Sequence, residues 1–537
     1  MLRLPIESRS IRRSTINQHS ERMPTPPSPE ELPPEKALHL IAQAIDDAAD
    51  RADDDLNSQA LKWCDQIESR LGSDAQRSLL DYFRANGWAN RAVARRGDQA
   101  GVWAWDLEEL GQQIFLLRRA VANPAFGQLD PVRRCQMLTN LANQLDTAGR
   151  FVESRQIWSR ALDLLPTFWM ARTNRGRSLM HYAHALYDPG HTAVFAMVGH
   201  RDLTEALDHI ASNPELGDAR LKSVFAAHAR AIESHFDLAG IRDDYRPDGF
   251  ALGRSKEERT YRRWCLNAGL FLNVLNDLGP DPIAAHDVLT LPDFVTPIHE
   301  PPVLVGFFNQ LKQEFVSARW LYFEGVTAEG VHVSDRGVLL YNTLDYPALG
   351  LAVEKVKAAY RLCYSLFDKI AFFLNHYMKL GIPERRISFR HVWRDKEAGP
   401  VRQAFLASEN WPWRGLFWLS KDLYESDLSN VLEPDARALH DLRNHLEHKY
   451  VKVVAPPGSA SGELPAGASG DTLAHVISSA DLGRKALKVL QLCRAALIYL
   501  SLGMHREEAR RRESDPTGVL LMPMPLDQWS DEWKRRW

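Results

Sequence analysis

The chain has 537 residues, a length that suggests more than one domain at roughly 150 residues per domain. Apolar residues make up 45% and charged residues 25%, which excludes a wholly disordered or fibrous chain. The 66 Lys and Arg are balanced by 69 Asp and Glu, so the net charge of −3 excludes a strongly basic coat that would hold nucleic acid non-specifically. Any contact with nucleic acid is therefore expected to be local.

The cysteines and the apolar windows indicate a soluble protein of a reducing compartment. The five cysteines lie far apart without a C-x-x-C pair, so neither a disulfide framework nor a zinc ribbon is predicted. Apolar windows such as Ala495 to Met504 fall short of the roughly 18 to 20 residues that span a membrane. We expect a cytoplasmic protein without a membrane partner, a secretory signal or a cofactor.

The N-terminal part of the chain reads as a tail followed by helical pairs. Residues 1–35 end in a proline-dense stretch, MPTPPSPEELPP, and are expected to be a disordered tail. Over residues 36–278 apolar residues recur at three- and four-residue spacing, with short Gly, Pro and Asp interruptions. This pattern predicts antiparallel helical hairpins.

One stretch of this region is repetitive. The segment Leu138 to Pro166 places small residues at the expected crossing points of a hairpin and large apolar residues between them. The small residues are Ala142, Gly149, Ser154 and Ala161. Asn174-Arg175-Gly176 follows Asn140-Leu141-Ala142 by 34 residues, and the segment resembles the tetratricopeptide repeat. The resemblance covers one full repeat and the first helix of another, and it implies an array with a concave binding face.

The C-terminal part is predicted to be a four-helix bundle. Residues 279–340 read as a proline-rich connector around one helix, Leu304 to Leu321, and residues 341–512 as the bundle. Its expected helices run from Asp345 to Leu380, around Leu416 to Leu428, from Pro434 through Val454 and from Ser479 or Asp481 towards Arg512. Residues 513–537 are a tail whose tryptophans suggest docking.

The third of these helices carries the residues that suggest chemistry. Its segment ALHDLRNHLEHKY, residues 438–450, gathers three histidines with Arg443, Asn444 and Glu447. Arg443, Asn444 and His448 match the R-N-x3-H form of an R-x4-6-H motif. The bare spacing recurs at Arg12/His19, Arg175/His181, Arg230/His235 and Arg386/His391. Arg443/His448 differs by the adjacent asparagine and by its place between long helices.

This segment resembles the active-site helix of the HEPN superfamily of small helical ribonucleases, over roughly Leu344 to Arg512. The resemblance implies metal-independent RNA cleavage, in which the ribose 2′-hydroxyl attacks the adjacent phosphate. His448 would shuttle the proton, since imidazole titrates near neutral pH. Arg443 would neutralise the phosphorane with its forked guanidinium, and Asn444 would orient the imidazole or the phosphate. HEPN domains generally pair, so a homodimer through the bundle is expected.

Other interpretations of the same residues remain open. Arg443, Glu447 and Asp441 are also suited to helix-surface ion pairs, with incidental histidines. A metal site is disfavoured because neither H-E-x-x-H nor H-x-x-E-H occurs, and His445 with His448 supplies only two ligands. Nearby, Asp368 is a candidate support for the arginine or the histidine, or a solvent-facing carboxylate.

A local basic and aromatic segment lies between the expected bundle helices. It is suited to phosphate contact and base stacking, or it is a solvated loop. It comprises Arg385, Arg386, Arg390, His391, Arg394, Phe389 and Trp393.

Taken together, the sequence predicts an all-α protein, with a tetratricopeptide-like array followed by a HEPN-like bundle that cleaves RNA. No phosphate-binding P-loop, dinucleotide fingerprint or serine-hydrolase elbow is present. By the same resemblance, the protein is expected to act as a toxin or in defence or stress, with a protein partner on the array. The alternative is a helical scaffold that binds protein, RNA or nucleotide without cleaving.

Overall fold

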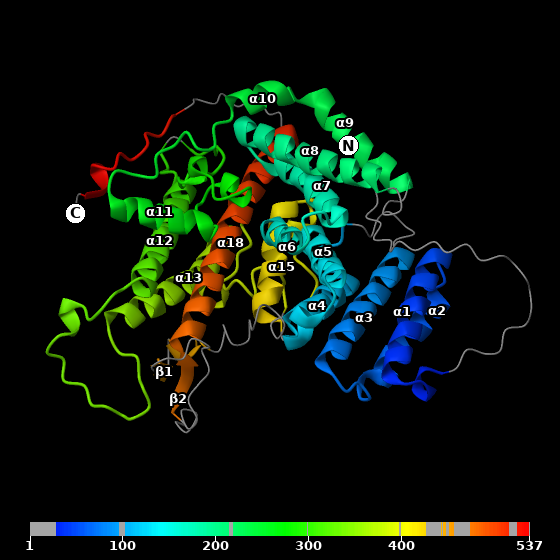
Figure 1. The fold of residues 1–537 in the computed structure, drawn as a ribbon. Coiled ribbons are helices and arrows are strands. Elements are labelled where there is room, and N and C mark those ends of the chain that lie inside the picture. The colour runs from blue at the N-terminus through cyan, green and yellow to red at the C-terminus, as the bar shows by residue number, and fades with distance from the viewer. Residues whose placement is uncertain are drawn as a thin grey trace, which may run out of the picture.

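The computed structural model describes residues 28–95, 103–213, 219–297, 299–396, 399–425, 442, 444–446, 450–455, 473–514 and 524–535. Most of these residues are helical, and the strands among them are few and short, which confirms the predicted all-α class (Figure 1). The helices of the N-terminal half, named the array here, are α1 (Pro34–Arg51), α2 (Asp54–Glu68), α3 (Asp74–Arg95), α4 (Glu108–Ala122), α5 (Pro131–Thr147), α6 (Phe151–Leu164), α7 (Trp169–Ala185), α8 (Pro189–Ser212), α9 (Ala219–His235), α10 (Leu238–Asp244) and α11 (Lys256–Asn267).

The C-terminal half, named the bundle here, is built on four long helices and a small sheet. Its helices are α12 (Val303–Val326), α13 (Leu351–Tyr377), the short α14 (Gln403–Leu406), α15 (Trp411–Tyr424) and α18 (Ser479–Ser514). Its strands are β1 (Tyr450–Val454) and β2 (Ala474–Ser478). Single 3₁₀ turns lie at Pro29–Glu31, Pro124–Gln128, Val274–Asp277, Pro282–Ala284, Val333–Asp335, Glu384–Arg386 and Trp533–Arg535.

The predicted hairpin over Leu138 to Pro166 is confirmed as the pair α5 and α6. Helix α5 starts where the Asp130 carboxylate accepts the first free N–H groups and Pro131 takes the first turn. Gly149 makes the turn with φ 85°, a conformation that favours glycine. Ala142, Ser154 and Ala161 are fully buried at the helix crossing, as their small size predicts.

Helix α18 is the central element of the bundle. It packs against α12, α13 and α15, and it also contacts α7 of the array (Figure 1). It is long and apolar enough to cross a membrane, but 83% of its most apolar window is buried inside the fold. This burial identifies a core helix. Helix α12, expected inside a connector, packs against α13 and α18 as part of the same bundle.

A buried network of charges joins the array to the bundle. The carboxylate of Asp422 on α15 accepts two hydrogen bonds from Arg118 of α4, at 2.6 and 2.7 Å, and a third from Arg150. Arg150 also pairs with Glu153, whose other oxygen accepts the hydroxyl of Tyr499 on α18. Asp422 and Arg150 are each 1% exposed, so the pairs are compensated charges inside one core.

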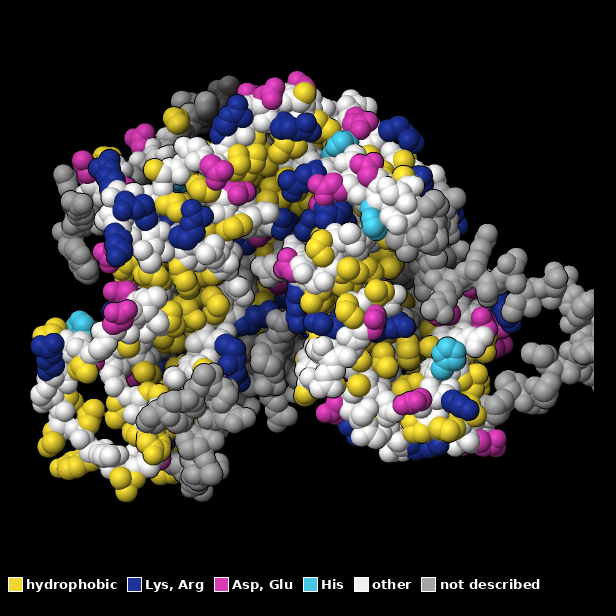
Figure 2. All heavy atoms as spheres, in the orientation of Figure 1, with side chains coloured by type: hydrophobic (Ala, Val, Ile, Leu, Met, Phe, Trp, Pro, Cys, Tyr) yellow, Lys and Arg dark blue, Asp and Glu magenta, His cyan; other side chains and the backbone are white. Residues whose placement is uncertain are grey.

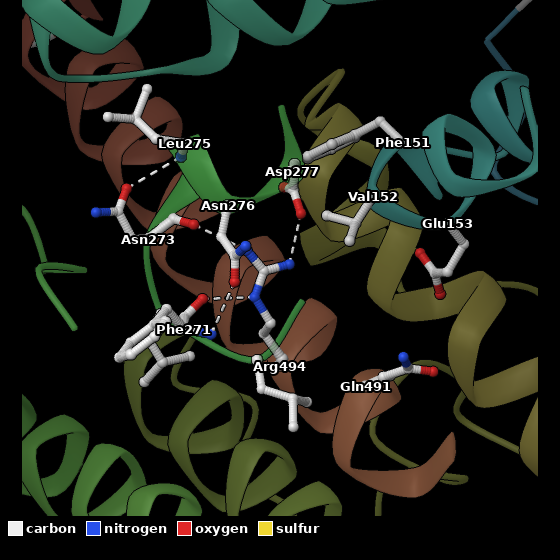
Figure 3. A network of polar contacts seen from close by, with 12 residues as sticks. Phe151, Val152, Glu153, Phe271, Asn273, Leu275, Asn276, Asp277, Gln491 and Arg494 are labelled. Carbon is white, nitrogen blue, oxygen red and sulfur yellow. Dashed lines mark hydrogen bonds and ion pairs between the residues drawn. The ribbon is translucent and has the colours of Figure 1, made fainter. Parts of the chain in front are cut away.

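A second buried network, shown in Figure 3, centres on Arg494 of α18. Its guanidinium donates to the carbonyl oxygen of Phe271 at 2.5 Å, to that of Asn273 at 2.8 Å and to Asp277 Oδ1 at 2.5 Å. The Tyr182 hydroxyl of α7 donates to the other oxygen of Asp277 at 2.8 Å. Helix α18 therefore packs against residues that lie more than two hundred positions earlier in the chain.

Two bundle elements differ from the sequence-based expectation. The helix predicted from Pro434 through Val454 is wrong at its end, because residues 450–454 form β1, which pairs in parallel with β2 from Tyr450↔Ala474 to Val454↔Ser478. The helix predicted to start at Asp345 begins instead at Leu351. The Ala348 N–H donates to the carbonyl oxygen of Val453 at 2.7 Å, and this bond holds the residues just before α13 against β1 instead of in a helix.

Residues 327–350 form a loop between α12 and α13 that we name the arm. It protrudes from the bundle at the lower left of Figure 1, and apolar side chains lie along it at the lower left of Figure 2. Leu339, Tyr341 and Leu344 are 78%, 78% and 84% exposed. The arm returns to the body where Asp345 pairs with Lys452 of β1 at 2.6 Å.

The C-terminal tail also differs from expectation. Trp529 and Trp533 contact each other, with ring centroids 6.4 Å apart, but both are exposed. The described part of the tail therefore does not bury these rings, and the predicted docking of these two is not observed.

Candidate functional site

The structure describes only part of the predicted motif helix. Leu442, Asn444, His445 and Leu446 are helical, whereas Arg443 and His448 lie outside the described residues. Leu442 is fully buried and Leu446 nearly so. Because they are four residues apart, they lie on the same face of the helix, and that face packs into the core. Asn444, the one predicted site residue that is described, is half-buried.

Helix α13 holds the motif helix through a polar contact. Arg361 Nη2 donates to the carbonyl oxygen of Leu446 at 2.8 Å. Carbonyls in the last turn of a helix lack intrahelical partners, so an arginine there satisfies a group that would otherwise need water. Arg361 was missed by the sequence analysis, since nothing in its local sequence distinguishes it from a surface arginine.

The two-stranded sheet lies next to the same segment. The imidazole of His445 contacts that of His475 on β2, with ring centroids 4.8 Å apart. Strand β1 begins at Tyr450, two residues after His448 in the chain. The buried residues Val451 and Val453 fix β1 in the core, so the chain on the far side of the motif is also anchored.

A charged pocket lies at the end of α15, the helix that precedes the motif segment in the sequence. It is lined by Arg390, His391, Trp393, Arg394, Phe417, Ser420, Lys421, Tyr424 and Glu425. Lys421 and Arg394 both pair with Asp106 of the array. Burial raises the pKa of Asp106, but the charge and hydrogen bonds of Lys421 and Arg394 leave it below its usual range. Burial raises the pKa of Glu425, which Lys421 only partly offsets.

The predicted basic and aromatic segment does not form a stacking surface. Phe389 and Trp393 are fully buried, at 0% and 1% exposure, and pack against other core aromatics, so their rings are not available to bases. Arg385 and Arg386 are exposed on the surface. Asp368 accepts the backbone N–H of Phe389 at 3.0 Å and thereby holds this segment against α13.

No group of three or more His, Cys, Asp or Glu side chains suited to a metal ion is found among the residues that the structure describes. Of the three histidines in residues 438–450, His445 is described, and His440 and His448 lie outside the described residues.

Comparison with known proteins assigns the bundle. A family model described as LA2681-like HEPN matches residues 295–507. The matched region contains α12, α13, α15 and most of α18, and it includes Arg443, Asn444 and His448. Neither the curated proteins nor the solved structures gave a match. Residues 295–507 are therefore similar to the LA2681-like HEPN family.

Proposed function

We propose that this protein is a metal-independent endoribonuclease whose active residues are Arg443, Asn444 and His448. The observation that carries the proposal is the HEPN family match, which includes the R-N-x3-H motif. The packing of Leu442 and Leu446, with the Arg361 contact, supports a fixed position for the motif helix.

The proposed reaction is an internal transfer at phosphorus. The ribose 2′-oxygen attacks the adjacent phosphorus, the bond from phosphorus to the 5′-oxygen breaks, and the products carry a 2′,3′-cyclic phosphate and a 5′-hydroxyl. His448 moves the proton from the 2′-hydroxyl or to the leaving 5′-oxygen, because a histidine can do both near neutral pH. Arg443 offsets the charge that develops on the phosphorane oxygens.

Pairing of two copies would complete such a site. Along a helix, Arg443 and His448 are separated by about 140° at 100° per residue, so one helix presents them in different directions. A twofold interface between bundles could bring the arginine of one copy towards the histidine of the other. We therefore propose a homodimer through the bundle, in the cytoplasm, with RNA as the substrate.

The array is proposed to regulate this activity. Helical hairpin arrays present extended surfaces to partners, and the array is joined to α15 and α18 by the two buried networks. A toxin or a defence or stress effector controlled by a protein on the array is the biological role that these features support. The alternative is a scaffold that binds RNA, nucleotide or protein without cleaving.

The test is RNA cleavage in EDTA by the full chain and by matched variants. Total RNA and a transfer-RNA pool are incubated with the wild type, with His448→Ala and with Arg443→Ala. The control is a double change at Arg230 and His235 to alanine, a pair with the same spacing on the exposed side of α9.

Discrete fragments with 2′,3′-cyclic phosphate ends are expected from the wild type and the control and from neither motif variant. Equal cleavage by His448→Ala would refute the assigned role. Intact RNA with every protein, at concentrations where the proteins bind RNA, would favour the scaffold.

A further inference from the structure

The arm exposes more apolar surface than a single soluble chain normally does. Nine of its large apolar side chains are between 53% and 84% exposed. Six of them lie close together in the chain, at Val338, Leu339, Leu340, Tyr341, Leu344 and Tyr346. If each of the nine contributes on the order of 100 Å², together they expose about 900 Å². The largest apolar patch on a typical monomer is about 300–600 Å², so the arm is not an ordinary solvated loop.

The apolar part of the arm is held in one shape. The side-chain oxygen of Asn342 accepts the N–H of Leu344 at 2.8 Å, which closes a local turn. The φ angles of Leu344 and Tyr346 are 62° and 55°, a left-handed conformation that costs free energy for a residue other than glycine. Between them, Asp345 pairs with Lys452 of β1 at 2.6 Å. A loop that is fixed in this way loses little conformational entropy when it binds a partner.

The charges of the arm exclude two classes of partner. Residues 327–350 contain Glu329, Asp335 and Asp345 but only one Lys or Arg, which is Arg336. Residues 337–344 carry no charged side chain. RNA and anionic lipid surfaces are negatively charged and are bound through several Lys and Arg residues. The composition of the arm therefore fits the surface of another protein chain.

The arm is attached at the end of the bundle that carries the motif segment. The Ala348 N–H donates to the carbonyl oxygen of Val453, and Pro347 forms a bridge with Val454 of the same strand. This strand, β1, begins two residues after His448 in the chain. Figure 1 shows the arm and the two strands at the same end of the bundle. Two copies that pair around the motif would therefore have their arms beside that interface.

We propose that the arm docks on the bundle of a second copy of this chain and holds the two copies together. The inference rests on the proposed function, in which two bundles pair around the motif. A stable interface needs about 800 Å² from each partner, and the apolar surface of the arm alone is of that size. In a twofold dimer each copy contributes one arm and receives one, so both arms are covered.

The first test is the oligomeric state of the full chain, measured by sedimentation velocity over a range of concentrations. The arm variant carries Leu339→Ser and Tyr341→Ser, two positions that are each 78% exposed. The control variant carries Val93→Ser and Phe250→Ser, which are 58% and 46% exposed on the array. All four side chains lie at the surface, and circular dichroism reports whether each variant keeps the native fold.

Wild type and control are expected to sediment as dimers, and the arm variant as a monomer at the same concentration. The dissociation constant of the dimer should rise on the order of a hundredfold or more, because each copy loses two large apolar contacts from the interface.

A crosslinking experiment identifies what the arm touches. The five cysteines of the chain are buried, so Val338→Cys, an exposed position of the arm, can be labelled selectively with benzophenone maleimide. Illumination is expected to give a product of twice the chain mass, in which the label is joined to the bundle of the second copy.

Three outcomes would overturn the proposal. They are a wild type that stays monomeric at every concentration, which would assign the arm to a different protein, an arm variant that dimerises as tightly as wild type, and crosslinks that stay within one chain. RNA cleavage by the same proteins is measured in parallel. A dimer that depends on the arm but cleaves no RNA contradicts the nuclease and leaves the arm in its role, whereas cleavage by a monomeric wild type does the reverse.

Discussion

Replacing Asp422 with asparagine is expected to destabilise the whole chain, because that carboxylate neutralises two arginines at once. Its oxygens accept hydrogen bonds from Arg118 at 2.6 and 2.7 Å and another from Arg150, and all three side chains are at most 6% exposed. An asparagine of the same shape would leave the buried guanidinium of Arg118 without a charge partner and would leave Arg150 paired with Glu153 alone. Breaking a buried ion pair on one side costs about 3–5 kcal/mol.

The expected change in melting temperature follows from the length of the chain. An unfolding entropy of about 2.1 cal/mol/K per residue amounts to about 1 kcal/mol/K for a chain of this size that unfolds as one unit. The loss at Asp422 therefore corresponds to a fall of about 3–5 °C. The assay is thermal unfolding followed by circular dichroism and by calorimetry, which also tests whether the transition is single.

A matched change on the surface serves as the control. Asp47 pairs with Arg51 at 3.8 Å with side chains 42% and 69% exposed, so Asp47→Asn should alter stability by about 0.5 kcal/mol or less. If Asp422→Asn shifts the melting temperature no more than Asp47→Asn does, the buried network does not hold the array to the bundle and the reasoning fails.

Three further predictions concern the turn of the array, a buried acid and the motif helix. Gly149→Ala should lower the free energy of unfolding, measured in urea, by about 2 kcal/mol or more, because φ is 85° and the new Cβ would lie 2.4 Å from a backbone oxygen of α15. The control is Gly127→Ala, which should change the free energy of unfolding little because no atom lies within 4 Å of the added Cβ. Burial raises the pKa of Asp146 to about 6, so the native state holds the proton of this carboxyl more tightly than the unfolded chain does. The tighter proton binding stabilises the native state fully below about pH 4, and this stabilisation is lost as the pH rises to about 6. The stability of wild type relative to Asp146→Asn should thus fall by about 3 kcal/mol across that window, and a flat difference would contradict the assigned pKa. Arg361→Ala should slow RNA cleavage about fivefold by removing about 1 kcal/mol of support from the motif helix, whereas the exposed Arg386→Ala should not; equal rates would show that this contact does not position the motif.

Helical periodicity and small residues made the array and the long bundle helices predictable from sequence. The crossing residues Ala142, Ser154 and Ala161 are buried as expected, and α18 starts at Ser479, one of the two starts expected for it. Such signals are local, because they depend on residues three and four positions apart. The sequence analysis failed where a local signal was misjudged: Val451, Val453 and Val454 form a β-branched run that favours β1 over a continued helix.

The contacts between the array and the bundle could not be predicted in the same way. Arg118 and Asp422 are 304 residues apart, and nothing in either neighbourhood indicates a partner for the other. The candidate site likewise has one part that the sequence reveals and another that depends on tertiary packing. The spacing of Arg443 and His448 is visible in the sequence, whereas the contact of Arg361 with the motif helix depends on how α13 packs. The burial of Phe389 and Trp393 also depends on packing, since their sequence suits an exposed patch equally well.

The charge network of Asp422 has a consequence for how the protein is made. On the ribosome, Arg150 leaves the tunnel 272 residues before Asp422 does, and Arg118 leaves it 304 residues before. At about 5–20 residues per second this delay is about 15–60 seconds, during which the nascent array has no acid from α15 for these two arginines. Tyr499 and Arg494, which complete the contacts of Glu153 and Asp277, emerge later still. The array should therefore stay incompletely packed until α15 and α18 have been synthesised, so folding of the two halves is coupled and largely follows translation.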